Sequence, residues 1–269
     1  MLEEFKYNKG ETDNFRISAS QFSKFIDKPW QWYREQILEE DLFEGSTSSY
    51  LGTIVHTGAE RVSKGLDFTR EDVEEFLSTI DDPEIDKNEI REQYPLMLKT
   101  LINDYVLSNA KVFHEAEPFI AIDLGDGIEV GGSIDRIEIA SVGAKPEDNT
   151  YRIVDYKTYN SKTKPKAIPQ HYRYQLLIYA YVYSKKVAPI SEVRLVYVNR
   201  NIDGGFSEKT GKPLKSYPPE VTVLTEQVTQ EDLNFIESMI MLCKETLLAS
   251  EKHPELLHII WHDPRLKKA

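Results

Sequence analysis

The segment YRIVDYK, at residues 151–157, decides the fold of this chain. Its side chains alternate in the manner of a β-strand, in which residues i and i+2 lie on the same face. Ile153, Asp155 and Lys157 therefore share one face of the predicted strand. The predicted strand therefore places a carboxylate and an ammonium group side by side.

An earlier segment, residues 128–139, has the same period and is predicted to be another strand. On that strand Asp135 and Ile137 share a face. If it pairs with the strand described above across the turn-rich segment 143–149, Asp135 and Asp155 meet on one patch of the sheet. The sequence thus predicts two carboxylates beside one lysine.

Helical patterns flank these strands. Ser18-Ala19-Ser20-Gln21 matches a capping box that would open a helix, Pro29 ends that helix or opens the next segment, and Gly65 is a helix stop. Helices are predicted at about 48–64, 170–186 and 229–250, and strands at 119–124, with a hairpin signal at Asp126-Gly127, and at 192–199. This order predicts a mixed α/β core with a central sheet flanked by helices.

The domain organisation follows from length and composition. A chain of 269 residues with 40% hydrophobic residues can form one large globular domain. We expect a single domain over residues 1–269, with a helical insertion at 66–110. The polar segment 201–219, which holds three glycines and three lysines, is expected to be a flexible arm or an extended hairpin.

The cysteine content and the hydropathy exclude several classes of protein. A single cysteine, Cys243, allows no disulfide within the chain and no multi-cysteine metal cluster, and its apolar neighbours predict a core position. No apolar run approaches the roughly 20 residues that cross a bilayer. Residues 1–10 are polar and charged, so a signal peptide is not expected, and we expect a cytoplasmic protein.

The charge distribution bears on the partner. A net charge of −12 argues against nucleic acid at first, because phosphate contacts need Lys and Arg. Residues 156–191, however, contain seven Lys or Arg, seven tyrosines and no acid. Interleaved aromatic and cationic side chains are typical of a surface that stacks on bases and contacts phosphates. A solvated surface is the alternative interpretation.

The paired carboxylates point to a metal ion. Two neighbouring carboxylates repel each other, so a buried pair needs a cation, and oxygen ligands favour Mg²⁺ or Mn²⁺. His56, on the predicted helix at 48–64, could add a nitrogen ligand. Glu60 lies four residues further on and shares the same helix face.

Each of these features also has a plainer explanation. Chance alone predicts about five or six acidic-x-basic triplets in this composition, so Asp155-Tyr156-Lys157 by itself proves little. A single helix histidine is more often a surface or core residue than a ligand, and Asp135-Arg136 could be a surface pair. Gln175 and Tyr179 could be a polar edge and a core aromatic.

Four motifs together resemble the RecB-like exonucleases of the PD-(D/E)XK nuclease superfamily. They stand in the family's order, each on the expected kind of element. The motifs are LGTIVH at 51–56, GSIDRI at 132–137, IVDYKT at 153–158 and QLLIYA at 175–180. The likeness spans roughly residues 17–198, and it implies a restriction-endonuclease-like core.

The resemblance also implies roles for individual residues. The implied metal ligands are His56, Asp135, Asp155 and the backbone carbonyl of Tyr156. Lys157 would orient the attacking water and offset phosphate charge, and Glu60 would be an outer partner of the metal or of His56. The residues expected to support the site or contact DNA are Gln175, Tyr179, Lys162, Lys164, Lys166 and Arg173.

The chain departs from some relatives in two ways. Where cluster-bearing members have Cys-Pro, this chain has Lys28-Pro29, so we expect no iron–sulfur cluster. It also has no GxxxxGK[ST] loop, so a helicase motor would be a separate protein. Compact members of this kind occur in phages and mobile elements and act in DNA recombination or repair.

The function expected from sequence is a metal-dependent DNA nuclease, an exonuclease acting on single strands or free ends. Its expected partners are DNA and a separate helicase or single-strand-binding protein. A structure-specific endonuclease would use the same motifs and remains an alternative. The other alternative is a non-catalytic DNA-binding module of a recombination or replication complex.

Overall fold

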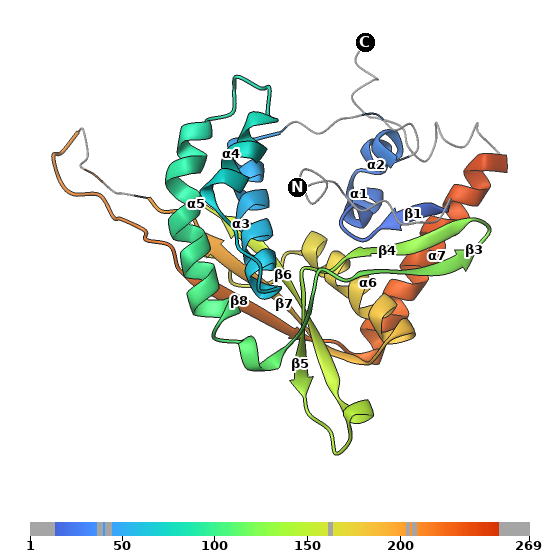
Figure 1. Cartoon of the computed structure of the whole chain (residues 1–269). Helices are drawn as coiled ribbons and strands as arrows, with labels where there is room; N and C mark the ends of the chain where they lie inside the picture. The colour runs from blue at the N-terminus through green and yellow to red at the C-terminus, as the bar shows by residue number, and fades with distance from the viewer. Residues whose placement is uncertain are drawn as a thin grey trace, which may run out of the picture.

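A five-stranded sheet with β6 as its middle strand forms the centre of the fold (Figure 1). The computed structural model describes residues 14–36, 40, 45–160, 164–202, 205 and 209–252. The sheet has the order β2-β5-β6-β7-β8, and only the β6–β7 pair is parallel. Its strands are β2 (Phe113–Ala116), β5 (Arg136–Ser141), β6 (Thr150–Tyr159), β7 (Ile190–Asn199) and β8 (Val221–Gln227).

A smaller sheet shows that the expectation of one strand over 128–139 was wrong. Its strands, in the order β1-β4-β3, are β1 (Phe15–Ser18), β4 (Ile128–Ser133) and β3 (Phe119–Gly125). β4 pairs with β1 and β3, whereas β5 pairs with β2 and β6, so the chain changes sheet at Ile134 and Asp135. Alternation of polar and apolar residues continues through the crossing, and it cannot reveal a change of pairing partner.

Helices cover both faces of the central sheet. One face carries α1 (Phe22–Asp27), α2 (Pro29–Gln36), α6 (Gln170–Lys186) and α7 (Gln230–Lys252); the other carries α3 (Thr47–Ser63), α4 (Arg70–Ser78), α5 (Lys87–Leu101) and the π-helical turn η2 (Ile102–Val106). Two 3₁₀ turns, η3 (Ala110–Val112) and η4 (Pro146–Asp148), complete the elements. Ile153 packs in the first core cluster and Val154 in the second, so Asp155 and Lys157 belong to the α6 face.

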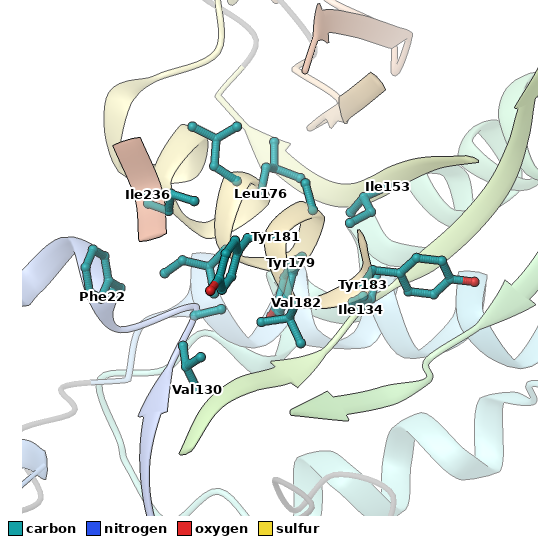
Figure 2. Packing of buried hydrophobic residues seen from close by; sticks show 14 of the residues in the cluster. Phe22, Val130, Ile134, Ile153, Leu176, Tyr179, Tyr181, Val182, Tyr183 and Ile236 are labelled. Carbon is teal, nitrogen blue, oxygen red and sulfur yellow. The ribbon is translucent and has the colours of Figure 1, made fainter. Parts of the chain in front are cut away.

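α6 has the bounds that the sequence predicts, but its tyrosines are core residues. Tyr179, Tyr181 and Tyr183 are buried (Figure 2). Tyr156 on β6 is buried as well. The prediction that all seven tyrosines form a base-stacking surface is therefore wrong for these four. The physical reason is that α6 packs against both sheets, α1 and α7, and a helix enclosed on several sides carries apolar residues around most of its circumference.

The capping box expected at residues 18–21 is wrong, whereas the helix stop at Gly65 is confirmed. Ser18 ends β1, and α1 begins at Phe22 without a side-chain cap, so the expected box at residues 18–21 does not form. α3 is capped instead by Ser46 and Ser49, and it ends before Gly65, whose φ is +71°. Toward the other end of the chain, Thr229 and Asp232 cap α7, which begins within a residue of the helix expected at 229–250.

The remaining segments bear on the domain predictions. α4, α5 and η2 occupy residues 66–110 and pack with α3 against the central sheet, and the insertion itself stays a prediction. In the arm, Ile202 and Tyr217 form an antiparallel bridge. Cys243 is buried, as predicted. Among the described helices, none combines the length and the apolar character that crossing a bilayer requires.

Candidate active site

The antiparallel pair β5–β6 brings the two aspartates together. Arg136 is paired with Val154, so Asp135, which directly precedes β5, lies beside Asp155. The backbone N–H of Tyr156 donates a hydrogen bond to Asp135 Oδ2 at 2.8 Å. This bond holds the carboxylate against β6 at the point where the pairing of β5 ends.

His56 reaches this pair from α3. The helix buries Leu51 and Val55 against the sheet, and His56 lies at the margin of that apolar stripe. Its Nδ1 is 3.4 Å from Asp135 Oδ2, and the side chains of His56 and Asp135 are 28% and 25% exposed. Both side chains are therefore mostly buried but keep some exposure to solvent.

Lys157 and α6 hold Asp155 from two sides. Lys157 Nζ lies 2.5 Å from Asp155 Oδ2, and Gln175 Nε2 donates to Asp155 Oδ1 at 3.1 Å. Gln175 Nε2 also lies 3.4 Å from Tyr179 Oη, and the ammonium of Lys157 lies 5.0 Å from the centre of the Tyr172 ring. Both oxygens of the 3%-exposed Asp155 thus have polar neighbours.

The electrostatics leave this cluster short of positive charge. Burial raises the pKa of Asp135 and of Asp155, although Lys157 opposes the shift in both, and Asp135 raises the pKa of Asp155 further. Burial alone would lower the pKa of Lys157, but Asp155 and Asp135 outweigh it and raise that pKa. One ammonium group therefore faces two carboxylates, and a further cation would stabilise their ionised forms.

His56 has the protonation state of a metal ligand. Burial, and then the charge of Lys157, lowers the pKa of His56 to about 4. The imidazole is therefore neutral at pH 7 and keeps a nitrogen lone pair. A neutral histidine beside the carboxylate of Asp135 can donate that lone pair to a cation.

The candidate ligands are of the types that bind a divalent ion, but their side chains do not yet surround a common point. In the part of the chain that the structure describes, no three His, Cys, Asp or Glu side chains surround a common point closely enough to form a metal site. Asp155 Oδ2 is buried and meets Lys157 as an ion pair without the alignment of a hydrogen bond. Two carboxylates and one neutral imidazole suit Mg²⁺ or Mn²⁺.

Glu60 lies one helical turn beyond His56, in a separate cluster. Lys64 Nζ lies 2.7 Å from Glu60 and 3.0 Å from Glu117. Burial and a hydrogen bond with Glu117 raise the pKa of Glu60 to about 8. The backbone N–H of Glu117 donates to the carbonyl oxygen of Asp135 at 3.2 Å. The cluster therefore supports the backbone that carries Asp135.

A cavity of about 230 Å³ opens beside Lys157. It lies between the N-terminal half of α3 and the C-terminal end of β6. Its lining consists of Ser48, Ser49, Gly52, Thr53, His56, Lys157, Thr158 and Tyr172. A larger hollow, of about 800 Å³, lies at the α4–α5 loop, but its acids, Asp81, Asp82 and Asp86, are not joined by a histidine. The smaller cavity is the one that adjoins the predicted chemistry.

The predicted basic contacts are only partly placed near the cavity. Lys162 lies outside the described residues. Lys166 is exposed, and Lys164 is exposed and pairs with Glu220 at 3.0 Å. Arg173 is not brought to the site, because its guanidinium pairs with carboxylates of β8 and α7, those of Glu226 and Asp232. A DNA contact by these residues stays a prediction.

Two residues that lie near the site were not identified from the sequence. Tyr172 lies over Lys157, and its spacing to Gln175 and Tyr179 (i, i+3, i+7) could have placed it on the same face of α6. Glu117 carried no such signal. Its place beside Asp135 depends on the meeting of the two sheets, which no local pattern encodes.

Comparison with known proteins gives a family and distant structural neighbours. No curated protein matches the sequence. A provisionally assigned exonuclease from Eubacterium rectale shares 14% identity and a TM-score of 0.49, over 87% of this chain and 80% of that one. An alkaline exonuclease from Laribacter hongkongensis shares 13% identity and a TM-score of 0.36, over 73% of this chain and 90% of that one. The complex of that enzyme with dAMP gives 12% identity and a TM-score of 0.32, over 77% and 98%.

The family model is the informative match. It is described as the PD-(D/E)XK nuclease superfamily and covers residues 16–247, which include every motif quoted above. The observed mixed sheet, flanked by helices on both faces, agrees with the restriction-endonuclease-like core that the resemblance implies. Members of this superfamily generally use divalent metal ions. The chain belongs to the PD-(D/E)XK nuclease superfamily.

Proposed function

We propose that this chain is a Mg²⁺- or Mn²⁺-dependent deoxyribonuclease, and that it acts as an exonuclease on single strands or free ends. The observation that carries the proposal is the convergence of Asp135, Asp155 and Lys157 from two paired strands with His56 from a helix, beside an open cavity. The RecB-like order of the four motifs supports exonuclease action.

The cation would be held by side chains of three elements. His56, Asp135 and Asp155 would be ligands, together with the backbone carbonyl of Tyr156. When bound, the ion supplies Lewis-acid stabilisation of the negative charge that develops on the phosphate. The neutral state of His56 and the excess of carboxylate charge both favour its binding.

Lys157 would contact the phosphate or the attacking water, and Gln175 would orient Asp155. The raised pKa of Lys157 keeps its ammonium charged at neutral pH. That ammonium can hydrogen-bond a phosphate oxygen or hold the attacking water. Gln175 donates to Asp155 Oδ1 and thereby fixes the orientation of the carboxylate, so that Oδ2 faces Lys157.

The cavity suits a nucleotide strand. Its lining offers hydroxyl groups of Ser48, Ser49 and Thr53 on α3, the ammonium of Lys157 and the ring of Tyr172. Hydroxyl and ammonium donors bind phosphate oxygens, and an aromatic ring can stack on a base. DNA is the expected substrate because the RecB-like motifs belong to DNA-processing enzymes.

A cleavage assay tests the proposal. Circular and end-labelled linear DNA, single- and double-stranded, would be incubated with the protein and Mg²⁺, Mn²⁺ or EDTA. We expect degradation of linear DNA with either metal, no degradation in EDTA and intact circles. Asp155→Asn and Lys157→Ala should each lower the rate by at least about 100-fold, which is the scale of losing one charged group of a preorganised site.

Matched variants control for charge and folding. Asp104→Asn and Lys99→Ala remove exposed groups of the same kinds on η2 and α5, and they should keep the original rate. Near-normal cleavage by Asp155→Asn or Lys157→Ala would contradict the assigned site. Destruction of circles would show an endonuclease, and a folded protein that binds DNA without cleaving it in any metal would show a non-catalytic module.

A further inference from the structure

The arm between β7 and β8 folds back on itself through an isolated antiparallel bridge outside both sheets. Ile202 and Tyr217 exchange backbone hydrogen bonds of 3.0 and 2.8 Å, and the N–H of Leu214 donates to the carbonyl of Gly205 at 3.0 Å. In Figure 1 this orange segment runs out past α5, away from the rest of the molecule. The structure describes residues 201–202, 205 and 209–219 of it.

The base of the arm is fixed to the rim of the candidate active site. Arg200, at the end of β7, bonds to Ser48 on α3 and, at 2.9 Å, to Glu89 on α5. Asn201 and Gln93 exchange two hydrogen bonds of 2.9 Å. Ser48 also lines the cavity beside Lys157. The arm therefore starts from the wall of that cavity rather than from a remote loop.

The described outer part of the arm makes no contribution to the core. Residues 209–216 are all exposed, and Leu214 is 54% exposed. An exposed arm held by an isolated bridge, without a buried apolar face, gains little stability from folding by itself. Because the arm buries so little surface, its role is better explained by binding a partner than by stabilising the core.

The charge of the arm identifies the kind of partner. Residues 209–217 contain Lys209, Lys212 and Lys215 and no acid, in a chain of net charge −12. None of the three lysines forms an ion pair with a carboxylate among the described residues, while Lys215 lies 4.8 Å from the centre of the Tyr217 ring. The whole arm also contains Asp203 and Glu208, which lie outside the described residues, so its lysines exceed its acids by one. Exposed lysines beside an aromatic ring complement a polyanion with flat bases.

A second basic segment lies against the same arm. Lys164, in the loop before α6, pairs with Glu220 where the arm returns to β8. Lys166 is exposed in the same loop, which leads to Tyr172 in the wall of the cavity. Basic groups are thus placed both at the base of the arm and along its length.

We propose that the arm is a clamp that binds the phosphates of the DNA strand outside the active site. This inference rests on the proposed function, since it extends the substrate path from the cavity to a second contact. A strand long enough to reach the arm would be held at two places, which strengthens binding by effective concentration without a new contact at the catalytic residues. A very short strand would fill the cavity alone.

The test compares the triple variant Lys209→Ala/Lys212→Ala/Lys215→Ala with Lys99→Ala/Lys111→Ala/Lys145→Ala, which removes three exposed lysines elsewhere. Fluorescence anisotropy in EDTA would measure the binding of labelled single strands of about 4 and about 30 nucleotides over a salt series. We expect the arm variant to lose about 10-fold or more in affinity for the long strand at low salt. Its log–log salt slope should become shallower by about 2 if all three phosphate contacts are lost.

The controls separate this proposal from the proposed function. Both variants should bind the short strand as the original protein does, and an arm variant with Lys→Arg should keep long-strand affinity. Equal losses in the two triple variants, a loss independent of strand length, or an unchanged salt slope would each overturn the clamp, and an acidic protein partner would then fit the arm better. Binding is measured in EDTA and needs no catalysis. A protein that fails to cleave DNA could therefore still show, or fail to show, the binding that the clamp predicts.

Discussion

Asp155 shows at the residue scale how the candidate site is assembled. One oxygen faces Lys157 at 2.5 Å and the other accepts a hydrogen bond from Gln175, so strand alternation and helix placement must both be right. Asp135 is held differently, by a backbone N–H of the neighbouring strand. Each motif alone is common by chance. Their side chains become a site because β5 and β6 pair in this register.

Glu60 provides a pH-dependent prediction at the same scale. The folded protein raises the pKa of Glu60 from 4.5 to about 8, so between these values the folded state binds a proton that the unfolded state has released. The contribution of Glu60 to stability is therefore highest below about pH 4.5 and falls as pH rises to 8. The largest slope for one proton is about 1.4 kcal/mol per pH unit.

Glu60→Gln is the matched variant, since it cannot ionise but keeps a group that can hydrogen-bond Glu117. Urea unfolding at several pH values between 4.5 and 8 would measure the free energy of unfolding of both proteins. We expect the original protein to lose stability relative to the variant as pH rises. A constant difference over this range would contradict the raised pKa.

Residue-scale prediction from sequence succeeded where the information is local. Asp155 and Lys157 share a face because of strand alternation. The helix period places His56 beside the buried residues Leu51 and Val55, and its Nδ1 lies 3.4 Å from Asp135. Glu117 could not be found this way. It sits at the crossing between two sheets, with a φ of +52°, and only the tertiary pairing of β2 and β5 brings it near Asp135.

At the scale of elements, β5 is anchored by a buried charge network behind the active site. The guanidinium of Arg136 and the carboxylate of Glu138 are 1% and 0% exposed and lie 2.8 Å apart. Arg136 also donates to Ser63 on α3 and to the backbone carbonyl of Asn109, while Tyr105 in η2 donates to Glu138. Asp135 directly precedes Arg136, so the network positions the strand that carries a candidate ligand.

Arg136→Met should destabilise the protein by roughly 3 kcal/mol, because it leaves the carboxylate of Glu138 buried without its closest partner. The figure is taken at the low end of the range because Arg152 and Arg194 lie 3.8 Å from the same carboxylate. Chemical denaturation would measure the loss. Arg70→Met removes an exposed ion pair with Glu74 and should cost less than about 1 kcal/mol. Equal small losses would show that the network is not structurally important.

The elements that sequence patterns missed are those with the weakest local signals. Long, amphipathic or apolar helices such as α3 and α6 were placed to within about one residue. β1 and β2 have only four residues each, and β8 lies at the edge of the sheet after the arm. These strands are defined by distant pairing partners, such as β4 for β1, and a local window does not contain that information.

At the scale of the whole molecule, basic residues are concentrated in a few places on a chain whose overall charge is negative. The chain carries −12 overall, yet the cavity contains Lys157, the loop before α6 contains Lys164 and Lys166, and the arm contains three lysines. An acidic body with a basic path repels DNA except along that path. The overall charge therefore does not exclude a nucleic-acid partner, and its distribution predicts where the strand lies.

The most direct test of the central claim is an anomalous difference map from crystals of the full chain soaked in Mn²⁺. We predict a strong peak in contact with the side chains of His56, Asp135 and Asp155, next to Lys157. Asp135→Asn crystals should lose that peak. A peak confined to another acidic cluster, such as the hollow at Asp81, Asp82 and Asp86, or no peak at these residues at a saturating Mn²⁺ concentration, would contradict the account.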